Sequence, residues 1–171
     1  FCLPSGEHCL TYPVAGPNEE LTRGQRRRNW VWYRSAVSDA EQAALMTTAD
    51  GRRQGVSVPP HKVRAEAVAA MRRDARELLA PQIFELVQNI EEPFLQAIID
   101  LESPQVAFDR VAVLGDAAFV ARPHTGMGVT KAAEDAVALA QSLVAAGDDV
   151  NAGLIAWEQQ CLAYGRVAVA R

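Results

Sequence analysis

Residues 111–143 decide the fold, and they read VAVLGDAAFVARPHTGMGVTKAAEDAVALAQSL. The first four are apolar, as expected of a short strand that is covered on both faces, and Gly115 with Asp116 ends this strand. Small and apolar residues recur at helical spacing after the glycines of residues 126–128, and the pattern stops near Gly147. The sequence therefore predicts a strand, a glycine-rich loop and a helix that packs closely on a sheet.

This order of residues suits a ligand that is anionic or rich in electrons. Ligands of open α/β sheets bind outside the carboxyl ends of strands, where the Asp116 carboxylate can accept hydrogen bonds from sugar or ribityl hydroxyls. Gly115 lets the chain turn and the ligand approach closely. A helix that begins with glycines presents backbone N–H groups and the positive end of its dipole. The strand end, the aspartate and the glycine-led helix are each a weak signal alone, because such features often only end a strand or begin a helix.

The ordered combination is more specific. It consists of Gly115-Asp116-Ala117-Ala118, Pro123, Gly126, Gly128 and Glu134-Asp135-Ala136. This set resembles the second FAD-binding motif of the single-component FAD-dependent aromatic hydroxylases, the family of para-hydroxybenzoate hydroxylase. The segments GDAAFVARPHTGMG, NWVWYR and EEPFLQAIIDLE are similar to the 2,6-dihydroxypyridine 3-monooxygenase branch of that family. The resemblance covers nearly the whole chain.

The resemblance implies a mixed α/β (α+β) fold that corresponds to the C-terminal portion of a flavoprotein hydroxylase. Residues 1–103 would form the second half of a β-sheet substrate-binding domain with helices. Residues 104–147 would form the closing strand and helix of a Rossmann-like FAD-binding domain, and residues 148–171 a C-terminal helix. The GxGxxG that anchors the ADP half of FAD in this family does not occur in the sequence. We therefore expect a fragment that is inactive by itself and binds FAD weakly.

The resemblance also assigns site residues. Those expected to contact FAD are Gly115, Asp116, Pro123, Gly126, Met127, Gly128, Val129 and Thr130. Among them, Asp116 would bind the ribityl chain, and the backbone N–H groups of residues 126–130 would face the pyrimidine end of the flavin. The candidates for a position beside the reactive flavin edge and the substrate are Pro123 and His124.

Substrate contacts are expected from Tyr12, Gln96 and His124, because the strands of Tyr12 and Gln96 belong to the sheet that roofs the substrate in this family. The sequence departs from para-hydroxybenzoate hydroxylase at two positions. Phe119 stands where that enzyme has His, and Thr130 stands where it has Asn. We therefore do not expect this chain to share the substrate of that enzyme.

The activity implied is that of an FAD-dependent monooxygenase. NADH or NADPH would reduce the flavin, O2 would add to form a flavin hydroperoxide, and this species would hydroxylate a small hydroxypyridine or phenol. Two alternatives stay open: a flavin-dependent reductase or dehydrogenase of the same fold, and a non-catalytic remnant that assembles with another chain. A homodimer is compatible with either kind of enzyme.

Composition limits the partners. With 17 basic and 21 acidic residues the net charge is -4, so the arginines at 23 and 26–28 lack the broad basic field that nucleic-acid binding needs. We expect them to lie on a solvated turn and strand edge.

Three cysteines without a CxxC pair and three histidines give no zinc-ligand spacing. No apolar stretch approaches the roughly 20 residues that a bilayer requires. We expect free thiols, a cytoplasmic location and no metal or membrane partner.

The remaining segments are assigned by pattern. A hairpin is expected in residues 1–15, where Cys2 and Cys9 could face each other, and a strand at 29–34 with Trp30 and Trp32 on one face. Helices are expected at 39–48, 62–79 and 81–89, the first with a capping box of Ser38 and Glu41. Residues 93–101 favour a strand. Lys131 and Glu134 are expected on the solvated side of the helix that follows the glycines.

Overall fold

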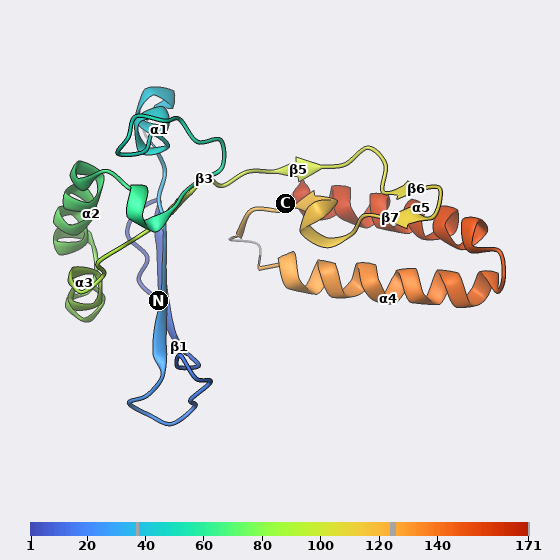
Figure 1. Ribbon diagram of the computed structural model, residues 1–171, viewed down its shortest axis with the longest axis horizontal. Helices are drawn as coiled ribbons and strands as arrows, with labels where there is room; N and C mark the ends of the chain where they lie inside the picture. The colour runs from blue at the N-terminus through green and yellow to red at the C-terminus, as the bar shows by residue number, and fades with distance from the viewer. Residues whose placement is uncertain (37, 124–125, 171) are drawn as a thin grey trace. The chain divides into compact units, whose positions relative to one another are not determined.

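The computed structural model describes residues 1–36, 38–123 and 126–170. The chain divides into two compact units, Phe1–Ala97 and Ile98–Arg171. Each unit has a hydrophobic core of its own. In the colours of Figure 1, the first unit runs from blue to yellow-green and the second from yellow to red.

The first unit is built on an antiparallel pair of strands, β1 (His8–Val14) and β2 (Arg27–Tyr33), in which Cys9 lies opposite Trp32. The strand predicted at 29–34 is thereby confirmed. The hairpin predicted in residues 1–15 exists only as a single bridge between Cys2 and Cys9, formed around the turn at Gly6, whose φ is +72°. The main partner of β1 is β2, because these two strands pair along their full lengths.

Helices follow the two strands. In α1 (Asp39–Leu45) the Ser38 hydroxyl accepts a hydrogen bond from the Glu41 N–H at 3.2 Å, as the capping box predicted. A 3₁₀ turn at Pro60–Lys62 precedes α2 (Ala65–Leu78), which therefore begins later than predicted. The helix α3 (Pro81–Gln88) follows with Pro81 in its first turn, where a missing N–H costs nothing.

The core of the first unit lies between this strand pair and the helices α2 and α3. Its buried residues are Cys9, Ala75, Leu79, Ile83 and Val87. Trp30 and Trp32 pack against this cluster, with ring centroids 6.3 Å apart in an edge-to-face arrangement. The two tryptophans therefore pack the sheet on the helices.

The strand predicted at 93–101 is wrong over most of its length. Only β4 (Leu95–Gln96) pairs there, with the equally short β3 (Ser57–Val58), and β5 (Leu101–Glu102) begins at its last residue. Ile98 is 46% exposed and Ile99 is 39% exposed, so their apolar character does not reflect burial. The boundary between the two units also falls inside this segment, after Ala97.

The second unit is dominated by two long helices, α4 (Gly128–Ala146) and α5 (Val150–Val169), which lie side by side in Figure 1. The helix predicted after the glycines is confirmed, and it ends at Gly147, whose φ is +60°. Two pairs of short antiparallel strands accompany the helices: β5 with β8 (Phe119–Val120), and β6 (Ala107–Phe108) with β7 (Val111–Ala112). No helix in the described part of the chain is long and apolar enough to cross a membrane.

The prediction of a strand at 111–114 that is covered on both faces is wrong. The strand β7 has two residues, and Val111 is 59% exposed. Burial on both faces requires strand neighbours and a layer of helices on each side. Among the described residues, β7 has β6 as its single strand neighbour.

Two glycines of α5 allow its close packing. A Cβ atom added at Gly165 would lie 2.5 Å from Cδ2 of the buried Phe119 ring. A Cβ atom added at Gly153 would lie 3.1 Å from the backbone oxygen of Ser142 in α4. The absence of side chains at these two positions therefore sets how closely α5 approaches Phe119 and α4.

We expect Gly165→Ala to destabilise the protein. Alanine normally stabilises a helix interior by about 0.5–1 kcal/mol relative to glycine. Here the added methyl group meets the Phe119 ring, and such overpacking costs about 1–3 kcal/mol. Urea unfolding followed by far-UV circular dichroism measures the difference. Gly55→Ala is the control because its Cβ would meet no atom within 4 Å. A Gly165→Ala protein as stable as the wild type would contradict this account of the packing.

Candidate functional site

The strand end that the sequence singled out forms a tight turn against α4. Gly115 begins the 3₁₀ turn Gly115–Ala117 with a φ of +63°, a conformation that side chains disfavour. A Cβ atom at Gly115 would lie 3.4 Å from Cβ of Ala132 in the second turn of α4. Asp116 follows directly and is exposed. The turn therefore holds a solvent-facing carboxylate close to the start of the helix.

A buried carboxylate holds this turn in place. Oδ2 of Asp135 accepts a hydrogen bond from the Gly115 N–H at 3.1 Å and from Nζ of Lys131 at 2.5 Å. The side chains of Asp135 and Lys131 are each 2% exposed. The backbone oxygen of Asp135 accepts a hydrogen bond from the Trp157 indole N–H at 3.0 Å. Asp135 therefore joins the Gly115 turn, the first half of α4 and the middle of α5.

The expectation that Lys131 lies on the solvated side of α4 is wrong. Its ammonium group is buried beside Asp135, one helical turn further on, and lies 4.7 Å from the centre of the Phe119 ring. Glu134 is exposed, as expected. The two residues were assigned together from charge alone, and the contacts of Lys131 with Asp135 and Phe119 distinguish it from the exposed Glu134.

The thiol of Cys161 completes the surroundings of Asp135. Its Sγ lies 3.6 Å from Oδ1 of Asp135, in hydrogen-bonding geometry for sulfur. Burial first, and then the charge of Asp135, raises the pKa of Cys161 to about 11. This cysteine therefore stays protonated near neutral pH and acts as a small apolar residue of the core.

The first residues of α4 are exposed. Gly126 has a φ of +64°, and α4 begins directly after Met127. Gly128 and Thr130 are exposed, and Val129 is 87% exposed. The amides of a first helical turn lack helical acceptors, and the helix dipole adds positive potential. This end of α4 can therefore meet an anion or a polarised carbonyl group.

An ion pair holds the segment that leads to Pro123. Nε and Nη2 of Arg122 donate to the carboxylate of Asp100 over distances of 2.7 to 3.2 Å. The hydrogen bonds and charge of Asp100 raise the pKa of Arg122. Pro123, the next residue, is exposed. His124, for which a role beside flavin and substrate was predicted, lies outside the described residues.

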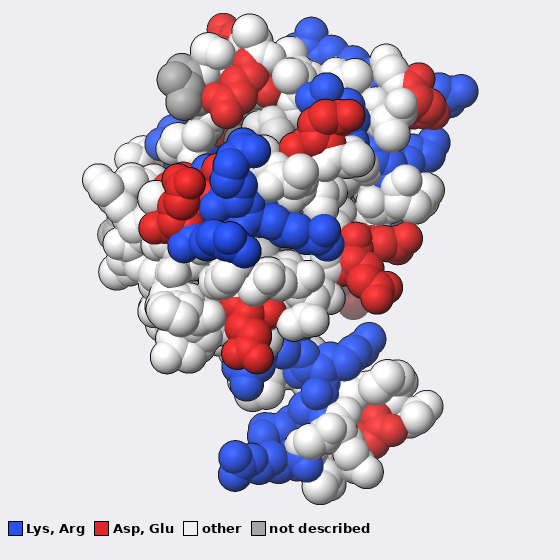
Figure 2. Space-filling view, turned by 90° about the vertical axis from the view of Figure 1, so that its left-hand side faces the viewer, with Lys and Arg blue, Asp and Glu red and all other residues white. Residues whose placement is uncertain are grey.

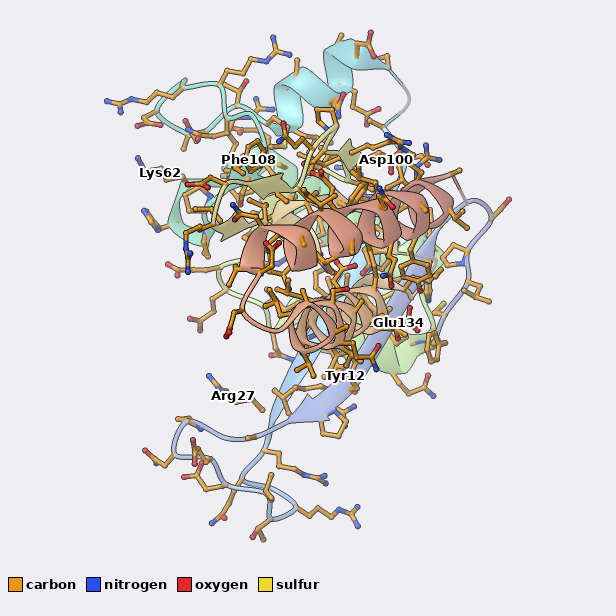
Figure 3. The ribbon with its side chains drawn as sticks, turned by 90° about the vertical axis from the view of Figure 1, so that its right-hand side faces the viewer. Tyr12, Arg27, Lys62, Asp100, Phe108 and Glu134 are labelled. Atoms are coloured by element: carbon orange, nitrogen blue, oxygen red, sulfur yellow. The ribbon has the colours of Figure 1, made fainter. Side chains whose placement is uncertain are left out.

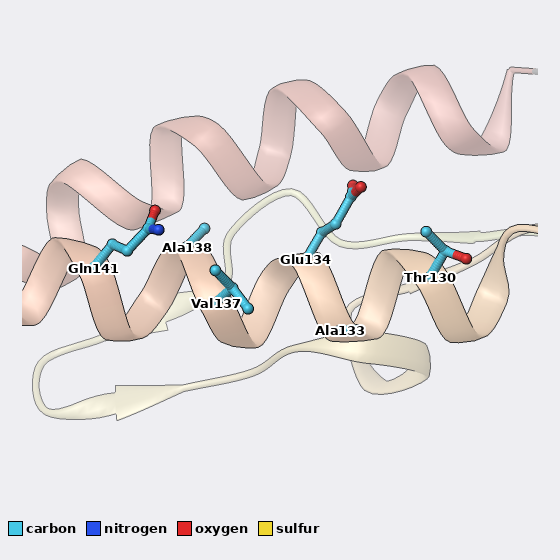
Figure 4. Close-up of a pocket in the computed structure, with 6 residues that line it drawn as sticks. All are labelled: Thr130, Ala133, Glu134, Val137, Ala138 and Gln141. Atoms are coloured by element: carbon cyan, nitrogen blue, oxygen red, sulfur yellow. The ribbon is translucent and has the colours of Figure 1, made fainter.

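The side of α4 also carries a shallow groove (Figure 4). It is lined by Thr130, Ala133, Glu134, Val137, Ala138 and Gln141. Its surface is mostly apolar, and Glu134 is the single ionisable residue among those that line it. The groove begins at Thr130, one of the residues predicted to contact a cofactor, and continues along the helix.

The two substrate candidates of the first unit lie on different sheets. Tyr12 lies on β1 opposite Asn29 and is 46% exposed (Figure 3), whereas Gln96 lies on β4 opposite Ser57 and is also exposed. Within this unit the sequence-based grouping of the two therefore rests on the resemblance alone. Their contact with a substrate stays a prediction.

The arginines at 23 and 26–28, in the loop after β1 and at the start of β2, are exposed, as expected of a solvated turn and strand edge. Figure 2 shows basic side chains gathered at this end of the strand pair. Nε of Arg27 donates to the backbone oxygen of Ala15 at 3.2 Å, so at least one of them supports the loop itself. In the described part of the chain, no group of three or more His, Cys, Asp or Glu side chains could hold a metal ion.

Comparison with known families identifies the class. Residues 1–100 match a family described as FAD binding domain-like, and residues 96–171 match one described as FAD binding domain. The chain belongs to the FAD-binding domain-like family. The expectation of FAD as the cofactor class agrees with both descriptions.

Individual relatives narrow the comparison. The chain is 30% identical over 159 residues to 2,6-dihydroxypyridine 3-monooxygenase of Paenarthrobacter nicotinovorans, covering 92% of this chain and 38% of the relative. The structure of 2,6-dihydroxypyridine-3-hydroxylase from Arthrobacter nicotinovorans matches 96% of this chain and 40% of its own, with a TM-score of 0.80 and 27% identity. HpxO of Klebsiella pneumoniae, solved with FAD and uric acid, matches 63% of this chain and 29% of its own, with a TM-score of 0.51 and 30% identity.

These comparisons confirm the resemblance to the FAD-dependent aromatic hydroxylases and the mixed α/β fold class. The chain spans about two-fifths of the length of the dihydroxypyridine relatives that it matches.

Sequence reasoning missed two pairs of residues at this site, Lys131 with Asp135 and Arg122 with Asp100. The first pair has i,i+4 spacing on a predicted helix, and this spacing is a signal for side-chain contact. It carries no information on burial, which depends on Phe119 and α5. The second pair is separated by 22 residues, and no local pattern connects them.

We expect Asp135→Asn to destabilise the second unit by about 3–5 kcal/mol, because it leaves the ammonium group of Lys131 buried without a counter-charge. Urea unfolding followed by circular dichroism measures the loss. Glu134→Gln is the matched control, since it removes the same charge from the neighbouring exposed position and should change stability by less than about 0.5 kcal/mol. Equal effects of the two substitutions would show that the buried pair does not stabilise the unit.

Proposed function

We propose that this chain forms the part of an FAD site that faces the ribityl chain and the pyrimidine end of the flavin. The enzyme would be an FAD-dependent, NAD(P)H-using monooxygenase that hydroxylates a small hydroxypyridine or phenol. The observation that carries the proposal is the Gly115 turn, which holds the exposed Asp116 beside the first turns of α4. The family match and the named relatives support the choice of cofactor and substrate class.

The donors and acceptors at this site suit FAD. The Asp116 carboxylate accepts hydrogen bonds, as ribityl hydroxyls require, and Gly115 has no side chain to obstruct the approach. The amides of residues 128–130 donate at the positive end of α4, as the carbonyl groups of a pyrimidine ring require. When bound, FAD would supply the redox chemistry, accepting a hydride and activating O2.

This chain's own residues would then bind, orient and stabilise. Negative charge that gathers at the pyrimidine end on reduction would be stabilised by preorganised amides of α4, which need no reorganisation at the moment of reaction. Pro123 and His124 would lie beside the reactive edge, and Tyr12 and Gln96 would contact the substrate. Their part would be to position the aromatic ring and to exclude water.

The proposal extends to the domain boundaries, the oligomeric state, the location and the substrate. The substrate-binding domain would comprise residues 1–103, the closing segment of the FAD domain residues 104–147, and the C-terminal helix residues 148–171. A homodimer is proposed as well, and a cytoplasmic location is proposed on the three free thiols. The names of the relatives favour a nitrogen heterocycle over a simple phenol, because one is a dihydroxypyridine hydroxylase and another was solved with uric acid.

The test is an oxygen-consumption assay of the longest natural form of the protein with FAD, NADH or NADPH, and 2,6-dihydroxypyridine or simple phenols. We expect O2 uptake that depends on the aromatic compound and a product heavier by one oxygen atom, detected by mass spectrometry. Oxidation of the nicotinamide without a hydroxylated product would contradict the monooxygenase assignment and favour a reductase or dehydrogenase.

A variant connects this activity to the proposed site. Asp116→Ala should weaken FAD binding about tenfold or more, because a hydrogen bond to a charged group contributes about 1.5–3 kcal/mol. Fluorescence quenching of FAD measures the affinity, and turnover at limiting FAD should fall in parallel. Asp148→Ala removes an exposed carboxylate from the far end of α4 and is the control. Unchanged FAD affinity of Asp116→Ala would contradict the assigned role.

A further inference from the structure

Cys2 and Cys9 form a facing pair across two antiparallel chain segments. The N–H of each residue donates to the backbone oxygen of the other at 2.8 Å, so the two residues exchange both hydrogen bonds. Residues paired in this way have Cα atoms about 5.5 Å apart and side chains on the same face of the sheet. A disulfide needs Cα atoms about 4.4–6.8 Å apart, so the backbone already has a suitable separation.

We propose that Cys2 and Cys9 are a site of reversible oxidation, at which a hydroperoxide converts the two thiols to an intramolecular disulfide. Both are free thiols in this structure. The proposal is independent of the flavin site, because it rests on the backbone β-bridge between Cys2 and Cys9 in the first unit.

The surroundings give the two thiols different parts. Cys2 is half-buried and can meet a small oxidant, whereas Cys9 is 0% exposed within the core formed with α2 and α3. Burial also raises the pKa of the Cys9 thiol, which disfavours its direct reaction. Cys2 is therefore the residue that reacts first, and Cys9 is the resolving residue.

The chemistry balances in two steps. With hydrogen peroxide as the oxidant, the Cys2 thiolate attacks one oxygen, the O–O bond breaks, and Cys2 becomes a sulfenic acid, while the hydroxide that leaves takes up the thiol proton to form water. The sulfur of Cys9 then attacks the sulfur of Cys2, the S–O bond breaks, and a second water leaves with the proton of Cys9. Two thiols lose two electrons, and hydrogen peroxide is reduced to two waters.

The geometry favours a bridge that is easily reduced again. Cβ atoms of a hydrogen-bonded pair lie near the upper end of the range for facing residues, so closure of a disulfide requires them to approach by about 1–2 Å. The approach acts against the packing of Cys9 on the tryptophans of β2. Strained disulfides of this kind are the labile ones, in contrast to structural bridges.

Closure would fasten the N-terminal segment to β1. That segment carries Glu7, whose Oε2 accepts a hydrogen bond from Nε1 of Trp32 at 2.8 Å and whose Oε1 accepts one from Nε of Arg34 at 3.1 Å. Oxidation therefore links a segment that already contacts β2 through side chains to the central strand by a covalent bond.

The test is stoichiometric oxidation of the reduced protein with hydrogen peroxide, followed by alkylation of the remaining thiols under denaturing conditions. Digestion after glutamate is informative because Glu7 lies between the two cysteines. We expect the peptides that contain Cys2 and Cys9 to stay joined after cleavage at Glu7 and to separate when dithiothreitol is added. Of the three thiols, only that of Cys161 should remain open to alkylation.

Three variants make the result decisive. Cys161→Ala should form the bridge as the wild type does, and Cys2→Ala, at a half-buried position, should fold and form none. Cys9→Ala should accumulate oxidised Cys2 without a bridge. Because Cys9 is buried, this substitution should destabilise the fold more than the other two. Persistence of all three thiols, a bridge between two copies of the chain, or joined peptides that resist dithiothreitol would overturn the proposal.

Discussion

The second unit depends on the hydrogen bonds that the buried Asp135 accepts. It accepts hydrogen bonds from the Gly115 N–H and the Lys131 ammonium group, and its backbone oxygen accepts one from the Trp157 indole. An ion pair inside a protein loses hydration, and it is tolerated only when its remaining hydrogen-bonding groups are satisfied. The Gly115 N–H satisfies one of these groups, so the turn and the two helices stabilise one another.

This constraint explains how the turn after such a short strand is held in place. The strand β7 has two residues and pairs with β6 alone among the described residues, so the sheet gives the Gly115 turn little support. The turn is instead held by α4, through the hydrogen bond to Asp135 and the contact with Ala132. The exposed Asp116 is thereby held beside the second turn of α4, the helix whose first residues are exposed. In the proposed FAD site, the hydroxyls of the ligand would face Asp116 and its carbonyl groups would face the first turn of α4.

The sequence predicted the elements of the candidate site well because their signals are local. Glycines mark the positive φ at Gly115 and the end of α4. The small and apolar residues of α4 do not mark its packed face, because Val129, Val137 and Val144 are exposed and the buried residues are Lys131, Asp135 and Ser142. The capping box of Ser38 was predicted for the same reason. What the sequence could not provide depends on contacts between distant segments. The burial of Lys131 requires Phe119, the pairing of Arg122 requires Asp100, and the exposure of Val111 reflects neighbours that periodicity does not reveal.

Hydrogen exchange of the Gly115 amide tests the central claim most directly. If Asp135 holds the turn, this amide should exchange in the same slow class as the buried amides of α5, measured by NMR in the native protein. The first-turn amides of Gly128 and Val129, which have no acceptor within the helix, provide the fast reference. A Gly115 amide that exchanges as fast as this reference would contradict the account.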